Sequence, residues 1–478
     1  MSAMTLIARD ELRLMRRNHV AVTAVLLLLL LTVVAVATAW THQQGIAETR
    51  ARHQRAANAA FEAQPDRHPH RVVHYGHFIF RPLSPLAAFD PGVDPFTGNT
   101  MFLEGHRQNT SNFGDVLQSS LLVRFGQLTP AFVLQAAVPL LLIFLGYGAV
   151  ARETERGTLR PLLLQGAAAW SIVLGKLAAL GLVAGVVGVP AMIGFALIAG
   201  QPGASIGPIA LIIIAYGAYL ALWSVAITLV STLVRRRRDA LLALLAIWAV
   251  TVVLLPRVAP DVAGQIYPLA NRLQTDVAIA RDLRWLGDSH NPDDPHFARF
   301  KADVLRRYGV TRVEDLPVNY KGLLAIEGEA ITSRLFDRYA RESYAAHAAQ
   351  NRMVLGFGLL SPTIALRQVS MASAGTDFGG HQRFLEQAER YRYDLVQRLN
   401  QLQADQVSYA DDTAVDAGAD RRKRIGADHW QRMPVFTFTP PTPATLVAAG
   451  LQGLAIIAGW LVAATLMLTA ATRRLGAK

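Results

Sequence analysis

The chain has 478 residues, of which 52% are hydrophobic and only 17% charged, whereas soluble domains are typically ~25% charged. It has no cysteine, which excludes disulfides, thiolate metal sites and cysteine nucleophiles. The net charge of +12 is concentrated beside apolar runs, as membrane topology requires, so we expect no nucleic-acid partner.

Six apolar runs are long enough to cross a lipid bilayer, which takes about 17 to 25 such residues. The first is not a cleavable signal peptide, because its apolar core is too long and the polar sequence after it is a poor cleavage site. The predicted spans are residues 19–40, 130–150, 171–200, 208–234, 240–256 and 444–472.

Basic residues gather in four segments next to these spans: 1–18, 151–170, 235–239 and 473–478. Six spans place all four on one side of the membrane, and the positive-inside rule makes that side cytoplasmic, with both termini. The four-arginine run in the third segment is then a topology anchor rather than a lipid-headgroup or nucleic-acid site.

Two long loops lie on the other side, at 41–129 and 257–443. In the first, a helix-like polar stretch at 43–63 precedes a passage rich in Pro and Gly at 80–98, where turns and extended pieces are favoured over helix. Residues 121–127 are expected to form a short amphipathic lead-in to the second span.

The second loop reads as a helical domain. A long helix is predicted from apolar residues spaced three and four apart, with Thr376 or Asp377 as its N-cap. Residues 324–353 show a similar pattern, so the two favour an antiparallel hairpin. The apolar stripe of the long helix consists of Phe384, Ala388, Tyr391, Leu395, Leu399 and Leu402.

Two further segments belong to this loop. The apolar link at 353–366 is too short to span, so it either lies on the membrane or is buried in the domain, and Ser361 followed by Pro362 predicts a helix start within it. Residues 411–424 are polar and predict a flexible, exposed linker.

Small and hydroxyl residues mark single faces of two spans. Gly181, Gly185 and Gly188 permit close helix contact, for which packing within the subunit is the simplest explanation. A stripe of Ser224, Thr228 and Ser231 fits backbone hydrogen bonding as well as a substrate path. No ionisable side chain lies near mid-membrane, so a proton-driven transporter is not expected.

The chain has no phosphate-binding loop of its own. The nearest approach, Gly175-Lys176-Leu177, lacks both the upstream glycine and the hydroxyl residue that such a loop needs. No His-Glu-x-x-His motif or nucleophile elbow is present either. We therefore expect no enzyme activity in this chain, and any nucleotide chemistry belongs to a partner.

Four histidines, His68, His70, His74 and His77, fall close together in the first outer loop. Imidazoles at such spacing can bind copper or zinc. The passage is turn-rich and has no accompanying carboxylate pattern or Met cluster, so adventitious metal binding is the simpler interpretation.

The charged stretch at 151–165 is the most informative motif, because it is helix-capable and held between two spans at the membrane surface. The span before it ends Leu-Gly-Tyr-Gly-Ala-Val150, followed by Arg152-Glu-Thr-Glu-Arg-Gly-Thr-Leu159. The simplest alternative is that the stretch is an ordinary loop connecting two spans.

This pattern resembles the ABC-2 type permease superfamily, including permeases for gliding motility and nitrous-oxide-reductase maturation. Motifs in the outer loops, among them Phe80-Arg-Pro82, Leu103-Glu-Gly-His-Arg-Gln-Asn109 and Leu360-Ser-Pro362, are similar to a subgroup with a large extracytoplasmic insertion between the fifth and sixth spans. That subgroup has no assigned function.

The resemblance implies an all-α polytopic membrane protein of the bacterial inner membrane, with a six-helix bundle like that of type V exporters. It also implies an interface helix at 1–18, a coupling helix at 151–170, a second permease copy or paralogue, and two ABC ATPase subunits that bind ATP and Mg²⁺. No cofactor is expected in this chain itself.

The coupling helix carries the implied site. Glu153, Glu155 and Arg156 are expected to contact the ATPase, and the helix to break and restart at Gly157 and Thr158. A row of leucines is expected to hold it to the bundle: Leu159, Leu162, Leu163 and Leu164. The residues assigned to ATPase coupling are Arg152, Glu153, Glu155, Arg156, Gly157, Thr158 and Leu159.

Three functions follow from these observations. The first is ATP-driven translocation, in the export direction, of an unidentified substrate by a permease subunit. The second is mechanical transmission of ATP-driven motion to a periplasmic partner through the outer helical domain. The third is a membrane-anchored module that binds a metal or ligand outside the membrane.

Overall fold

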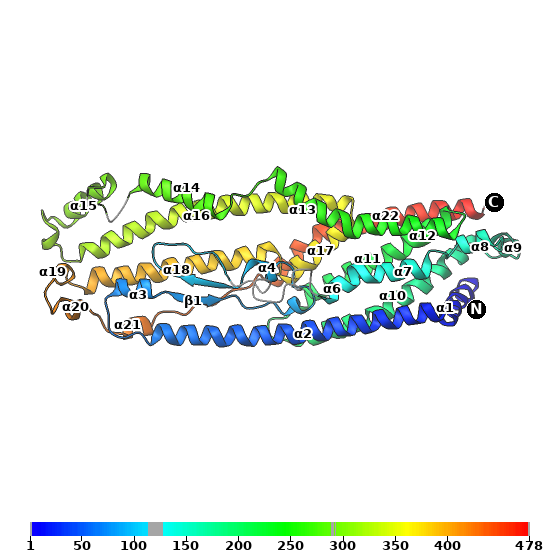
Figure 1. Ribbon diagram of the computed structural model, residues 1–478, viewed down its shortest axis with the longest axis horizontal. Coiled ribbons are helices and arrows are strands. Elements are labelled where there is room, and N and C mark those ends of the chain that lie inside the picture. The colour runs from blue at the N-terminus through cyan, green and yellow to red at the C-terminus, as the bar shows by residue number, and fades with distance from the viewer. Residues whose placement is uncertain (1, 113–127, 288–290, 292, 477–478) are drawn as a thin grey trace.

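The computed structural model describes residues 2–112, 128–287, 291 and 293–476, and shows an elongated, almost entirely helical molecule (Figure 1). One half holds the apolar helices and is called the membrane half; both termini lie at its far end, called the terminal end. The other half, the distal domain, comprises the last part of α2, α3 to β2, α14 to α16, and α18 to α21. The lead-in predicted at 121–127 lies outside the described residues.

Six helices in the described residues are long and apolar enough to cross a membrane. Three of them are little covered by the rest of the chain, since 22% of the most apolar part of the first, 6% of that of the fifth and 22% of that of the sixth is buried. Their apolar faces therefore suit contact with lipid or another chain. The six are His19–Glu62, Pro130–Glu155, Ala169–Ala199, Ile206–Leu233, Arg237–Ile266 and Pro443–Leu475.

Several of these spans are built from more than one element. The second consists of α6 (Pro130–Phe132), a π-helical turn, α7 (Val138–Gly146) and α8 (Ala151–Glu155), and the fifth of α12 (Arg237–Trp248), a π-helical turn and α13 (Leu255–Ile266). The third, fourth and sixth are α10 (Ala169–Ala199), α11 (Ile206–Leu233) and α22 (Pro443–Gly476).

The first span does not stop where its apolar run stops. α2 (His19–Glu62) is one helix of 44 residues, which at 1.5 Å per residue is ~66 Å long. The helix-like stretch predicted separately at 43–63 is its continuation into the distal domain (Figure 1). Asn18 caps it by accepting hydrogen bonds from the Val20 and Ala21 amides.

The turn-rich passage of the first loop contains a small sheet that the sequence did not predict. After α3 (Pro69–Tyr75), strands β1 (His77–Phe80) and β2 (Thr100–Leu103) pair antiparallel, with His77 opposite Leu103. Four-residue strands carry too little alternation to be recognised. Between them lie a 3₁₀ turn at Pro85–Ala88 and α4 (Asp94–Thr97).

The predicted helical hairpin is confirmed. α16 (Tyr320–Gly356) and α18 (Phe378–Gln406) lie side by side in the distal domain (Figure 1), with α14 (Arg272–Leu286) and α15 (Pro295–Tyr308) beside α16. Asp377 is the N-cap of α18 and accepts a hydrogen bond from the Gly380 amide at 2.9 Å.

The apolar link between the hairpin helices becomes α17 (Pro362–Ala374), with Ser361 at its N-cap. α17 packs against α11 and α22 and is largely buried there, although Leu359 and Leu360 before it are exposed. Neither predicted alternative is correct as stated, because the second part of the link is buried against spans of the membrane half and not within the outer domain. The link joins the distal domain to the membrane half.

The prediction of a flexible linker at 411–424 is wrong, because this segment is partly helical and held by distant residues. Short helices α19 (Tyr409–Thr413) and α20 (Ala419–Arg422) fall in this region, followed by α21 (Asp428–Gln431). The Asp412 carboxylate accepts hydrogen bonds from Asn319 and Gln403 and lies 3.0 Å from His68 Nε2. Polar composition suggested a free chain, but these long-range partners fix the segment.

Candidate functional site

The charged stretch after the second span forms two short helices at the terminal end. α8 (Ala151–Glu155) begins where the Val150 and Ala151 amides donate to Ser231 Oγ of α11, both at 3.0 Å. The chain then turns at Gly157, whose φ of +71° favours glycine, and continues as α9 (Leu159–Leu164). The break expected at Gly157 and Thr158 is present.

A buried carboxylate ties this segment to its neighbours. Glu11, on α1 (Ala3–Arg17), accepts a hydrogen bond from Arg152 Nη2 at 2.5 Å and another from Lys176 Nζ of α10. Glu11 and Lys176 are only 6% and 4% exposed, and buried charges are costly unless they are paired. One carboxylate therefore joins α1, α8 and α10.

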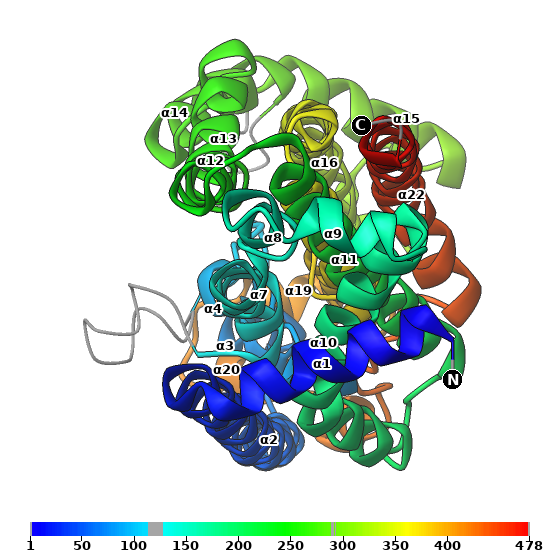
Figure 2. The same ribbon diagram turned by 90° about the vertical axis from the view of Figure 1, so that its right-hand side faces the viewer.

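α1 lies unusually close to α10. A Cβ atom at Gly175 would fall 2.8 Å from the Met4 carbonyl oxygen, so only glycine permits this approach. Figure 2, viewed onto the terminal end, shows α1 lying across the bundle beside α10. The near-match to a phosphate loop at Gly175-Lys176 is thus a packing contact and a buried ion pair.

The two glutamates expected to contact an ATPase already have partners in the chain. Glu153 accepts hydrogen bonds from Lys176 Nζ at 3.2 Å and Thr158 Oγ1 at 2.5 Å. Glu155 accepts from the backbone amide and Nε of Arg237, at 3.2 and 3.0 Å. Both carboxylates hold α8 in place, Glu153 on α10 and Glu155 at the start of α12.

The outward side of the segment carries a cation and apolar surface. Arg156 is exposed, and its guanidinium makes no ion pair with any described residue. α9 has no buried residue, and Leu164 is 80% exposed. The expectation that its leucines hold the segment to the bundle is wrong for Leu164, while Leu159, Leu162 and Leu163 are only partly covered.

The glycine face of α10 is open instead of packed. No described atom lies within 4 Å of a Cβ built on Gly181, Gly185 or Gly188, so the expected packing within the subunit does not occur there. The three glycines line an apolar groove of about 620 Å³ between α10 and α11.

The hydroxyl stripe of α11 serves the backbone. Ser224 and Thr228 donate to carbonyl oxygens one turn earlier in their own helix, and Ser231 holds the start of α8. Among the described residues this stripe therefore bonds to the protein's own backbone, in agreement with the simpler of the two predicted explanations.

Sequence reasoning missed a polar cluster inside the membrane half. Tyr216 Oη accepts from Gln135 Nε2 at 2.6 Å and contacts Ser370 Oγ at 3.2 Å. Tyr219 Oη donates to the Gln135 carbonyl and contacts Thr363 Oγ1, both at 2.9 Å. The only feature of the sequence that could have indicated this cluster is the pair of tyrosines three residues apart in an apolar helix. Their hydrogen-bond partners come from α17 and the second span.

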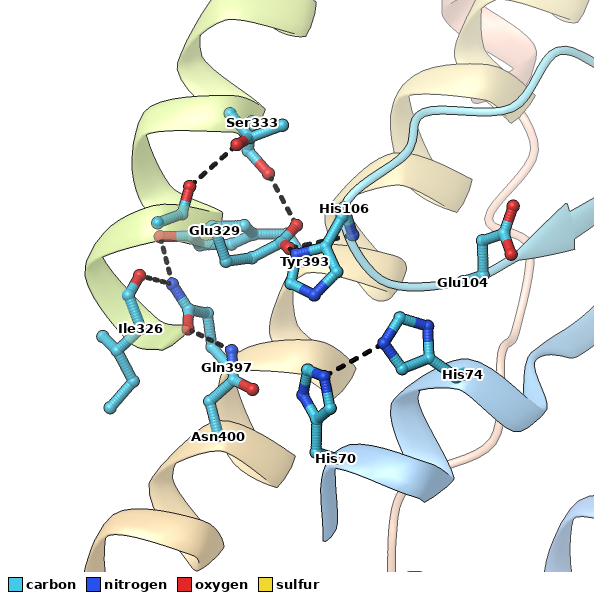
Figure 3. Close-up of polar contacts among 12 residues, drawn as sticks. His70, His74, Glu104, His106, Ile326, Glu329, Ser333, Tyr393, Gln397 and Asn400 are labelled. Atoms are coloured by element: carbon cyan, nitrogen blue, oxygen red, sulfur yellow. Dashed lines mark hydrogen bonds and ion pairs between the residues drawn. The ribbon is translucent and has the colours of Figure 1, made fainter. Parts of the chain in front are cut away.

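The four predicted histidines separate in the structure. His68 caps α3 by accepting from the His70 amide, and its Nε2 faces Asp412. His77 is buried against Phe61 and Tyr391, and burial lowers its pKa to about 4. His70 and His74 remain together, and His106, which was not predicted, joins them (Figure 3).

Comparison with known proteins agrees with this architecture. Residues 5–301 match the family model for ABC-2 family transporter proteins, and residues 272–439 match a domain of unknown function, DUF3526. No curated protein matches the chain.

The chain therefore belongs to the ABC-2 transporter family. It is a multi-pass membrane protein, the membrane subunit of an ABC transporter, and the family implies an ABC ATPase as its partner. The DUF3526 match covers α14 to α18 and most of the segment that follows, so it takes in the part of the distal domain that the second outer loop supplies.

Proposed function

We propose that this permease couples ATP hydrolysis in separate ABC ATPase subunits, which bind ATP and Mg²⁺, to export of a substrate across the bacterial inner membrane. The terminal end lies in the cytoplasm and the distal domain in the periplasm. A second permease copy or paralogue completes the membrane part, and this chain has no catalytic site.

The observation that supports this proposal most directly is the two-sided character of the segment at 151–165. Its inner side is fastened by Glu11, Glu153 and Glu155 to α1, α10 and α12. Its outer side offers Arg156 and Leu164. A rigid segment held in this way passes a displacement on to three helices at once.

This division changes the roles assigned to the charged residues. Arg156 and Leu164 are the residues that contact the ATPase, since a cation and an exposed leucine suit the polar rim and apolar centre of an interface. Arg152, Glu153 and Glu155 transmit the movement, because their charges are paired with residues of the same subunit.

The test uses the permease co-purified with its ATPase in lipid. Arg156→Ala combined with Leu164→Ser should abolish the permease-dependent part of ATP hydrolysis and weaken co-purification. Arg299→Ala is the matched control, since Arg299 is exposed on α15 at the opposite end of the molecule. Unchanged hydrolysis and co-purification in the double variant would refute the assignment.

A second candidate function is mechanical transmission to a periplasmic partner, and the continuity of α2 favours it. One unbroken helix contacts α1 at the terminal end and β1 in the distal domain. A helix this long is stiff enough to convey a tilt between the two ends without a channel for substrate.

Gly45, in the middle of α2, permits a sharp test, because no described atom lies within 4 Å of a Cβ there. Gly45→Pro should break the helix, whereas Gly45→Ala should strengthen it. The absence of cysteine allows spin labels on the distal domain and α10. If ATP still moves the distal label in Gly45→Pro, α2 is not the transmitting element.

A further inference from the structure

Three imidazoles meet on the surface of the distal domain, far from the terminal end. One ligand nitrogen each from His70, His74 and His106 can be chosen such that all three lie within 4.8 Å of one another. His70 Nε2 and His74 Nε2 are 3.0 Å apart, and the His106 ring centroid lies 5.6 and 5.4 Å from those of His70 and His74. Figure 3 shows the three rings converging from two segments.

The first two histidines are placed by helix geometry. They are four residues apart on α3, so they project from one face, which is the spacing that zinc-binding helices use for a pair of histidines. The helix start is fixed, because His68 accepts from the His70 amide while its other nitrogen faces Asp412. The pair is therefore held in one orientation before any ion arrives.

The third histidine is held by a strained turn. His106 has φ of +63°, and it is the only non-glycine residue with positive φ in the described chain. A Cβ atom on neighbouring Gly105 would fall 2.2 Å from Val73 Cγ1 of α3, so the turn sits tightly on that helix. Such strain persists only where the surroundings impose it.

A buried carboxylate imposes it. Glu329 of α16 accepts the His106 amide hydrogen at 3.1 Å, and the same oxygen lies 3.3 Å from His106 Nδ1. Arg392 Nη1 of α18 holds the other oxygen of Glu329 at 2.6 Å. A carboxylate on Nδ1 fixes the tautomer in which Nε2 carries the lone pair, as in carboxylate–histidine–zinc arrangements.

We propose that His70, His74 and His106 bind one divalent transition-metal ion of the kind that prefers imidazole, Zn²⁺ or Cu²⁺, with Glu329 as the residue that orients His106. Three imidazoles leave a coordination position for water or an incoming ligand. His74 is exposed, so the site is open to solvent.

A metal ion at this site would also link separate segments of the distal domain. Glu329 and Arg392 belong to the α16–α18 hairpin, whereas the three histidines belong to the first outer loop. The ion would therefore fasten α3 to the turn at His106 within the first outer loop, and Glu329 already joins that turn to the hairpin. A hydrogen-bonded His70–His74 pair would need neither a third imidazole nor a carboxylate aimed at it.

The first test measures binding by the full chain in detergent, purified through a histidine-free tag and stripped of metal. Titration with Zn²⁺, and separately with Cu²⁺ against a competing chelator, should show one ion per chain and identify the preferred metal. His70→Ala, His74→Ala and His106→Ala should each weaken binding on the order of 100-fold or more. His53→Ala, an exposed histidine on α2, should change nothing.

The second test gives a signal from the site itself and uses an exposed position that folding tolerates. Because the chain has no cysteine, His74→Cys should give a thiolate-to-cobalt absorption band with Co²⁺, and His53→Cys should give none. Absence of that band in folded His74→Cys protein, or metal binding by the parent that the three alanine variants leave unchanged, would overturn the proposal.

Discussion

The two halves of the molecule handle buried polarity in different ways. In the distal domain, Arg392 is 1% exposed and bonds to both Glu329 and Glu389, and Arg81 pairs with Asp94 at 2.7 Å. In the membrane half, the buried polar cluster uses hydroxyls and an amide, on Tyr216, Tyr219 and Gln135.

The difference follows from the surroundings of each half. An ion pair buried inside a domain that is surrounded by water loses its hydration energy, but hydrogen bonds of good geometry can offset that loss. A charge at bilayer depth has far fewer partners that could offset the same loss. The buried ion pairs of the membrane half accordingly sit at its terminal end, around Glu11. Each region can be tested through its own polar contacts.

The largest effect is expected from Arg392→Met. It leaves Glu329 and Glu389 buried without their partner, which costs about 3–5 kcal/mol in comparable cases. Burial by itself raises the pKa of Glu329, but the His106 hydrogen bond and the Arg392 charge outweigh it and lower the pKa to about 2. Limited proteolysis should show an opened distal domain and an intact membrane half.

Arg398→Met is the matched control for that substitution, because Arg398 is exposed on the same helix. Its proteolysis pattern should equal that of the parent. Simultaneous loss of both halves in Arg392→Met would show that they fold as one cooperative unit, which would contradict the division drawn between them.

A smaller effect is expected at the terminal end from Glu11→Gln. The amide cannot neutralise Arg152 and Lys176, and such a loss at a buried hydrogen-bonded group costs about 1–3 kcal/mol. The thermal midpoint should fall, and permease-dependent ATP hydrolysis should fall with it. The control Asp10→Asn, at the exposed neighbouring residue, should change neither the thermal midpoint nor ATP hydrolysis. If the two variants had equal effects, Glu11 would have no special role in anchoring the terminal end.

The smallest expected effect is a dependence of stability on pH, which arises from two buried histidines of the distal domain, His77 and His381. Burial lowers the pKa of His77 and, with help from the charge of Arg81, that of His381, in each case to about 4. The unfolded chain takes up these protons near pH 6.5. Stability is therefore full above that value and is lost as pH falls toward 4, by roughly 1–2 kcal/mol per histidine at pH 5.

His77→Phe should remove part of this dependence, because an aromatic ring fits between Phe61 and Tyr391. His53→Phe, at an exposed position, should leave it unchanged. The measurement is the midpoint of distal-domain proteolysis or melting between pH 7.5 and 5. A slope that is the same in the parent and in His77→Phe would show that His77 does not contribute.

Several parts of the fold were predictable because they depend on neighbours in sequence. Six apolar runs correspond to six long helices, and the stripe through Phe384 and Leu395 lies on α18 with Asp377 at its cap. The break at Gly157 was predictable for the same reason, since it depends on one residue's own backbone freedom.

Other parts were decided by partners far away in the chain. The polar composition of 411–424 did not reveal that Asp412 would meet His68, Asn319 and Gln403. The charges of Glu153 and Glu155 suggested an external partner, whereas Lys176 and Arg237 are close enough to bond them. Charge alone does not say which opposite charge will be nearest.

By itself, then, the sequence determined which segments are apolar helices, where they are capped and which family the loop at 151–165 resembles, because periodicity and caps act over a few residues. Only the tertiary structure decided that α2 joins the two halves, that Glu11 anchors the terminal end, and that His106 completes the group begun by His70 and His74. Those contacts join residues distant in the chain, and their geometry arises only when the helices pack.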